Sequence, residues 1–207
     1  MIDILRVLGE IESDEYLQPL TNTLLGYLNH ESPHIRVEAL RVFFRIKGAE
    51  SKSIYLDLLN DPDIDIQQEA IHCLATVKST TALGKFLEML KNSEDSPSAK
   101  TERLEACLYK ALGFYGNCEL PGEGSLEDFL LATIKRQLSL GRLSFSTIKG
   151  KAIKPETVAA ICEALGNIGT SKSRKTLHKL NKQKDSLWQN KAQKALTKIA
   201  EREETAA

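Results

Sequence analysis

The stretch Ile161-Cys162-Glu163-Ala164-Leu165-Gly166-Asn167-Ile168-Gly169 carries the pattern that decides the fold. Near the beginning of the chain, Ile4-Leu5-Arg6-Val7-Leu8-Gly9-Glu10-Ile11 repeats the same apolar core. In both stretches apolar residues recur at steps of three and four, which places them on one face of a helix. The pattern therefore predicts a helix in each stretch and an internal repeat that relates them.

Further copies of this helix are found along the whole chain. Each copy has one apolar anchor that aligns with Leu165, and these anchors are Leu8, Phe43, Leu74, Leu112, Leu165 and Leu196. The anchors are separated by 35, 31, 38, 53 and 31 residues, which is the range of repeats built from helix pairs. Each interval holds a second predicted helix, at 14–27, 51–59, 80–90, 125–138 and 171–180, and the last repeat lacks one.

Helix start signals accompany these patterns. Ser32-Pro33 and Asp61-Pro62 place a capping side chain before a proline at the first helical position. Ser125 with Asp128, and Ser186 with Gln189, have the spacing of capping boxes. We therefore predict helix starts at these four places, and strand-like alternation only within 142–148.

Two stretches carry a resemblance to a known family. Pro33-His34-Ile35-Arg36-Val37-Glu38-Ala39-Leu40 and the stretch from Glu163 to Gly169 resemble the bacterial HEAT-like repeats first recognised in phycobilisome lyases. The resemblance implies an all-α fold, an α-solenoid or superhelix of about six HEAT-like helix pairs. Members of this family are mostly protein-interaction scaffolds, while some bind DNA and a few are lyases or glycosylases. Such a resemblance implies a fold more than a function.

We expect residues 1–207 to form a single repeat domain with two insertions. The 53-residue interval holds about 22 residues beyond a 31-residue repeat, which predicts insertions at about 116–124 and 141–155. The first helix has no capping residue before it, so we hypothesise that Met1 begins a piece of a longer array or a partner-covered one. A native short first helix is the alternative.

No short motif for a catalytic, metal or cofactor site withstands inspection. Asp61, Asp63 and Asp65 alternate as in a calcium loop, but that loop needs a glycine and a bidentate glutamate where Ile66 and His72 stand. The four cysteines form no CxxC pair, and we expect them to be free thiols that act as small apolar residues. No apolar run approaches the length of a membrane span. We therefore expect a cytoplasmic protein that is not an enzyme and has no cofactor, and the family resemblance implies a bacterial one.

Charge is distributed unevenly, although the whole chain is neutral. Residues 1–133 hold 12 Lys and Arg against 22 Asp and Glu, a net charge of −10, and residues 134–207 hold 16 against 6, a net charge of +10. In the helix predicted from Ser171, one stripe is formed by Lys172, Lys175, Lys179 and Lys182. The C-terminal half is therefore the half that would attract an acidic partner.

The second helices of HEAT stacks line the concave surface, so the basic residues of two successive second helices are expected to share a groove. The insertion at about 141–155 adds further basic and apolar residues. The predicted partner-binding residues are Lys135, Arg136, Arg142, Phe145, Lys149, Lys151, Lys154, Lys172, Lys175, Lys179 and Lys182. The alternative is that these side chains only keep the surface solvated.

These observations predict a non-catalytic scaffold or adaptor that binds the acidic surface of a protein partner through its C-terminal half. Nucleic-acid binding is the alternative, with Lys and Arg contacting phosphates, although only Phe145 and Trp188 offer aromatic surface for base stacking. A lyase or glycosylase is a third reading, and family analogy alone supports it.

Overall fold

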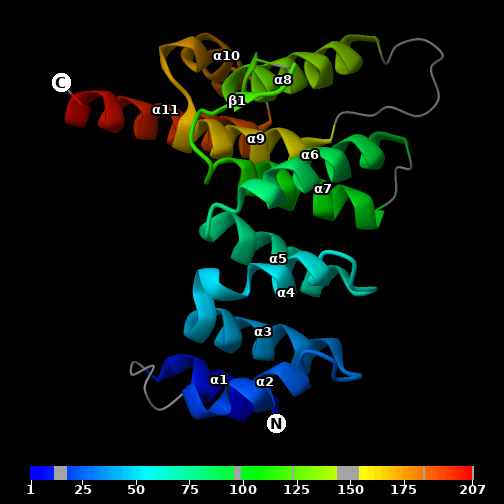
Figure 1. Ribbon diagram of the computed structural model, residues 1–207. Helices are drawn as coiled ribbons and strands as arrows, with labels where there is room; N and C mark the ends of the chain where they lie inside the picture. The colour runs from blue at the N-terminus through cyan, green and yellow to red at the C-terminus, as the bar shows by residue number, and fades with distance from the viewer. Residues whose placement is uncertain (12–17, 96–98, 123, 144–153, 184, 207) are drawn as a thin grey trace. The chain divides into compact units, whose positions relative to one another are not determined.

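The computed structural model describes residues 1–207 except 12–17, 96–98, 123, 144–153, 184 and 207. The chain divides into two compact units, residues 1–84 and 85–207. The division falls within helix α6 (Thr80–Asp95). Helices make up most of both units, which confirms the all-α fold that the repeat pattern predicts (Figure 1).

In the first unit the anchor-bearing helices are stacked in chain order, with α1 against α3 and α3 against α5 (Figure 1). Each second helix packs on the next first helix, α2 on α3 and α4 on α5. The elements are α1 (Ile2–Glu10), the 3₁₀ turn η2 (Gln18–Leu20), α2 (Thr21–Tyr27), α3 (Pro33–Lys47), the 3₁₀ turn η3 (Gly48–Ser51), α4 (Lys52–Leu58) and α5 (Ile64–Thr76).

The second unit repeats this plan. Helices α7, α9 and α11 lie side by side, and α8 and α10 run along one side of them (Figure 1). Besides the end of α6, its elements are α7 (Ala99–Leu112), β1 (Glu119–Leu120), β2 (Gly124–Ser125), α8 (Leu126–Leu143), α9 (Pro155–Ile168), α10 (Ser171–Asn181) and α11 (Ser186–Ala206).

Four of the six predicted anchors lie in the cores of the stacks, while Leu8 and Leu196 are half-buried. Phe43 is 1% exposed, and Leu74, Leu112 and Leu165 are fully buried. Burying a leucine or phenylalanine side chain contributes about 1.5–3 kcal/mol to folding, so these helices are held mainly by their apolar faces.

Two of the predicted helix starts are wrong by a few residues. Helix α5 begins at Ile64, and its capping side chain is Asp63, which accepts a hydrogen bond from the Asp65 amide, rather than Asp61. At α11 the amides of Leu187 and Trp188 donate to Asp185, so the cap precedes the predicted Ser186 by one residue. Pro62 and Ser186 are local signals, but the cap is decided by which residue has extended backbone angles.

The other two starts agree in position. Helix α3 begins at Pro33, although the Ser32 side chain makes no capping hydrogen bond. At α8 the Asp128 amide donates to the Ser125 hydroxyl at 3.2 Å, as a capping box requires.

The insertion predicted at about 116–124 contains a short hairpin. Strands β1 and β2 pair antiparallel, with Glu119 opposite Ser125 and Leu120 opposite Gly124. Gly122 and Gly124 have φ values of 78° and 75°, which glycine adopts without strain. Of the second insertion, residues 144–153 lie outside the described part of the chain, and the alternation predicted within 142–148 falls largely there.

Candidate partner-binding site

A groove of about 690 Å³ lies between α8 and α10, within the second unit. Its lining residues come only from these two helices and are Asp128, Phe129, Leu131, Ala132, Lys135, Lys172, Lys175, Thr176 and Lys179. Phe129, Leu131 and Ala132 provide an apolar floor, and four lysines provide positive charge above it. Both helices are second helices of their pairs.

The four lysines of the groove differ in what they contact. Lys172 forms an ion pair with Asp128, and its ammonium group lowers the pKa of that carboxyl group. In the part of the chain that the structure describes, no carboxylate forms an ion pair with Lys135, Lys175 or Lys179. These three lysines are exposed, so their charge is available to a ligand.

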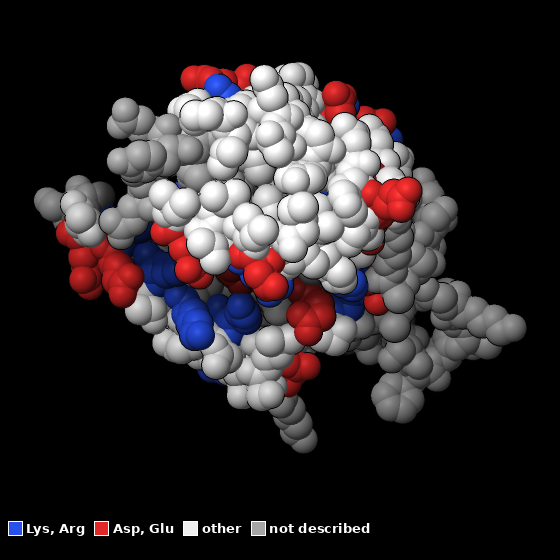
Figure 2. Space-filling view, turned by 90° about the horizontal axis from the view of Figure 1, so that it is seen from below, with Lys and Arg blue, Asp and Glu red and all other residues white. Residues whose placement is uncertain are grey.

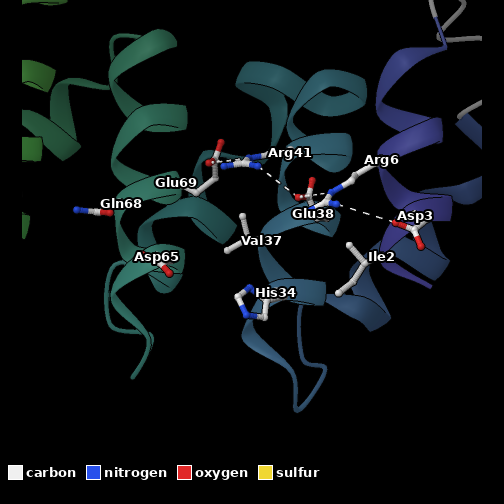
Figure 3. A pocket seen from close by; sticks show the side chains of 10 residues that line it. All are labelled: Ile2, Asp3, Arg6, His34, Val37, Glu38, Arg41, Asp65, Gln68 and Glu69. Carbon is white, nitrogen blue, oxygen red and sulfur yellow. Dashed lines mark hydrogen bonds and ion pairs between the residues drawn. The ribbon is translucent and has the colours of Figure 1, made fainter.

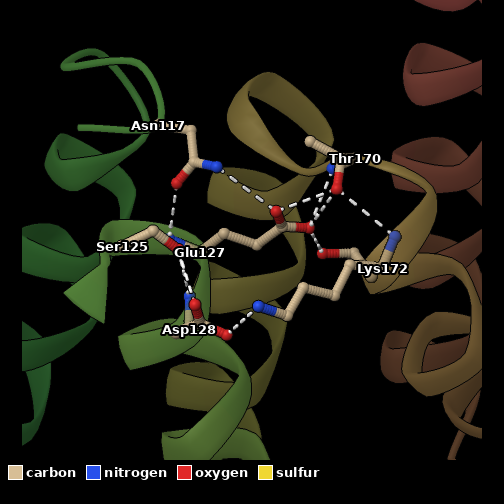
Figure 4. A network of polar contacts seen from close by, with 7 residues as sticks. Asn117, Ser125, Glu127, Asp128, Thr170 and Lys172 are labelled. Carbon is tan, nitrogen blue, oxygen red and sulfur yellow. Dashed lines mark hydrogen bonds and ion pairs between the residues drawn. The ribbon is translucent and has the colours of Figure 1, made fainter. Parts of the chain in front are cut away.

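A buried carboxylate fixes the end of the groove where α8 begins (Figure 4). Glu127 is 2% exposed and accepts hydrogen bonds from the Thr170 amide at 2.8 Å and from the Ser173 hydroxyl at 2.5 Å. Asn117 joins the same network, donating to Glu127 and accepting from its amide. Glu127 therefore ties the first turn of α8 to the first turn of α10, and so sets the spacing of the two groove walls.

The structure places the other predicted binding residues elsewhere. Arg136 is exposed on α8 and Lys182 follows α10, but neither lines the groove. Lys154 contacts the buried carboxylate of Glu105 at 2.5 Å, so it holds the start of α9 against α7. Phe145, Lys149 and Lys151 lie outside the described residues, as does the side chain of Arg142.

A second, polar groove of about 620 Å³ lies in the first unit, on the surface formed by α1, α3 and α5 (Figure 3). Arg6 and Arg41 both contact Glu38, at 3.3 and 3.4 Å, and Arg41 also contacts Glu69 at 2.9 Å. Basic and acidic side chains thus alternate across the three helices. Its lining has four acidic and two basic side chains, a net charge of −2, against four basic and one acidic, a net charge of +3, in the groove between α8 and α10.

These ion pairs have a register that sequence inspection missed. Arg6 and Arg41 each stand two residues before an anchor, and their partners Glu38 and Glu69 stand five residues before the next anchor. The pair Glu163–Lys191, at 2.7 Å, has the same register with the charges reversed. Comparison of charges at these two offsets could have identified the ladder. Exposed pairs of this kind contribute about 0–1 kcal/mol each, so they align helices more than they stabilise them.

The cysteines of the chain are buried or half-buried. None of the four cysteines, all within the described residues, forms a disulfide, and burial raises the pKa of the Cys162 thiol to about 12, which makes it a poor nucleophile at neutral pH. Within the described part of the chain no three His, Cys, Asp or Glu side chains gather as metal ligands. No helix in that part has the length and apolarity that crossing a bilayer requires.

Comparison with known proteins agrees with the repeat architecture. Residues 21–106 match a family model described as HEAT repeats, which confirms the predicted HEAT-like resemblance over that part of the chain. No curated protein sequence matches the chain.

Proposed function

We propose that this HEAT-repeat protein is a non-catalytic scaffold that binds the acidic surface of a protein partner in the groove between α8 and α10. HEAT repeats are commonly protein-interaction scaffolds. The observation that carries the proposal is the set of three exposed lysines, Lys135, Lys175 and Lys179, around an apolar floor. Lysines steer an acidic partner, while Phe129 and Leu131 supply the apolar contact that charge alone does not give.

The composition of the groove favours a protein over a nucleic acid. Trp188, one of the two aromatic residues considered for base stacking, is 7% exposed, and its indole N–H donates to the Pro155 carbonyl at 3.1 Å. It therefore cannot stack on a base. Phe129 is the aromatic residue of the groove, and it is stacked on Tyr109 with ring centroids 6.4 Å apart.

The groove can be tested by charge reversal. A fluorescein-labelled helical peptide with glutamates on one face and leucines on the other serves as the acidic ligand, and fluorescence anisotropy measures its affinity. Replacing Lys135, Lys175 and Lys179 together by Glu should weaken binding at least tenfold, because attraction becomes repulsion at three points. Helicity by circular dichroism should not change, since all three side chains are exposed.

A matched control reverses three exposed lysines away from the groove, Lys85, Lys91 and Lys194, and changes the net charge equally. This variant should keep most of the affinity. An equal loss of affinity in both variants would show that only overall charge matters and would contradict binding in the groove. A 20-base-pair DNA duplex distinguishes the alternative: binding tighter than that of the peptide, with log affinity falling by about 0.9 per phosphate contact per unit of log salt, would favour nucleic acid.

A further inference from the structure

Three of the largest exposed apolar side chains in the described part of the chain belong to one short segment of the first unit. Met1, Ile4 and Val7 are 55%, 59% and 60% exposed. Residues at steps of three lie on one face of a helix, so these three form a continuous apolar strip along α1. Figure 2 looks onto α1 and α2 of the first unit, and most of the surface nearest the viewer is uncharged, with charged groups at its margins.

The same face is covered in later repeats. Ile4 and Val7 stand four residues and one residue before the anchor Leu8. The residues at those two offsets in α3, α5, α9 and α11 are all at most 2% exposed, and they are Ala39, Val42, Ala70, Cys73, Ile161, Ala164, Ala192 and Ala195. This face is therefore the one that receives a preceding first helix, and we call it the receiving face.

Three of the four covering helices, α1, α7 and α9, share a signature, whereas α3 has Phe44 at the corresponding place. A Cβ atom built at Gly9 of α1 would lie 3.9 Å from the Val42 side chain of α3. One built at Gly166 of α9 would lie 3.1 Å from Cα of Ala195 on α11, and one at Gly113, just after α7, would lie 2.9 Å from Cα of Ala164 on α9. Each glycine directly follows an anchor leucine. A small residue at this position lets the two backbones approach closely.

From this register we propose that the receiving face of α1 binds an amphipathic helix of a partner protein. On its packing face that helix carries a leucine followed by a small residue. The interface continues the helix-on-helix packing that recurs along both stacks. It is separate from the groove between α8 and α10 and does not depend on it.

A second copy of this chain fits the receiving face poorly. The outward face of α11 presents Gln193, Lys194, Thr197 and Glu201, all exposed, and Thr197 stands where a covering helix carries its small residue. Head-to-tail stacking would thus bury polar groups on apolar ones. Two α1 helices facing each other would oppose branched side chains at the point of close approach, and would bring their Arg6 side chains near one another.

The test uses the full chain and a helix-stapled peptide of residues 155–169, which contains Leu165 followed by Gly166. Stapling is needed because isolated helices of this length are marginal in water. Hydrogen exchange of α1 amides is measured with and without peptide. We expect at least tenfold slower exchange of the Leu5–Leu8 amides at saturation, because a bound helix suppresses local opening.

Two substitutions, one in the peptide and one in the chain, should each abolish this protection. The peptide with Gly166→Leu should give no protection, since its leucine side chain prevents close approach. The wild-type peptide should likewise give no protection to the α1 amides of the Val7→Glu chain. Absence of protection with the wild-type peptide, or equal protection with Gly166→Leu, would overturn the proposal. A wild-type chain that is dimeric by light scattering and monomeric as Val7→Glu would also overturn it, by showing that a second copy covers the face.

Discussion

Single polar side chains, buried or half-buried, hold the turns between helices in this protein. Arg36 donates to the carbonyl oxygen of His30 at 2.8 Å and to the carboxylate of Asp61 at 2.8 Å, so it links two successive turns. Gln67, at the same place in the next repeat, donates to the Asp61 carbonyl. Glu105, again at this place, binds Lys154. In these three repeats the position holds neighbouring turns while the residue type changes, whereas in α9 it is the apolar Val158.

Glu127 is the most connected of the buried carboxylates described above, and its removal should be costly. We predict that Glu127→Ala lowers the free energy of unfolding by about 1–3 kcal/mol, because the Thr170 amide and the Ser173 hydroxyl lose their acceptor in a buried site. Urea unfolding followed by circular dichroism measures the change. Glu201→Ala, at an exposed glutamate of α11, should change stability by less than about 0.5 kcal/mol. Similar effects of the two changes would contradict the network.

At the scale of elements, the stack is held by first helices that approach closely through small residues. Ala164 and Ala195 receive the preceding helices, and Gly113 and Gly166 lie against them. Larger residues at these points would push the helices apart, and the buried anchors beside them would lose contacts. Close packing of this kind restricts the size of the residue at each contact more strongly than the apolar periodicity that locates the helices.

Glycine-to-alanine substitutions at two positions should therefore change the free energy of unfolding in opposite directions. Gly113→Ala should destabilise the protein, because the new Cβ would lie 2.9 Å from backbone Cα of Ala164 and one helix must shift. Gly84→Ala should stabilise it by up to about 1 kcal/mol, because nothing lies within 4 Å of the new Cβ and alanine favours the helix. Thermal unfolding of both variants checks the signs. A stabilising Gly113→Ala would show that α7 and α9 are packed less closely than described.

At the scale of the whole molecule, neutrality conceals opposite charges on the two units. Residues 1–84 hold 7 Lys and Arg against 13 Asp and Glu, a net charge of −6, and residues 85–207 hold 21 against 15, a net charge of +6. A chain with zero net charge lacks the mutual repulsion that keeps most proteins apart in solution. Oppositely charged units of different molecules attract at low ionic strength.

We therefore predict weak, salt-sensitive attraction between molecules at pH 7. The second virial coefficient from static light scattering should be negative at about 10 mM salt, where the Debye length is about 30 Å, and should rise toward zero or above at about 0.3 M. Salt should act in this direction because screening removes the attraction between units. A coefficient that falls as salt is added would indicate apolar association instead.

The sequence by itself determined the helical class, the repeat and its anchors. A helix buries its apolar stripe wherever a neighbour covers it, so steps of three and four located four of the six anchors in the core, Phe43, Leu74, Leu112 and Leu165, while Leu8 and Leu196 are half-buried. The phase of the lysines along α10 also follows from helix geometry alone, and three of the four predicted stripe residues, Lys172, Lys175 and Lys179, line the groove. Periodicity is a local property, and these results depend on local geometry only.

The tertiary structure alone decided which residues are covered or bound by a neighbouring helix. Lys154 and Lys175 look alike in the sequence, yet Lys154 lies against buried Glu105, while Lys175 lies in the groove. Val7 and Val42 occupy the same repeat position, but one is 60% exposed and the other 2%. In each case the difference comes from a neighbour distant along the chain. Such contacts have no periodic signature, because they depend on how helices are placed rather than on how each helix is formed.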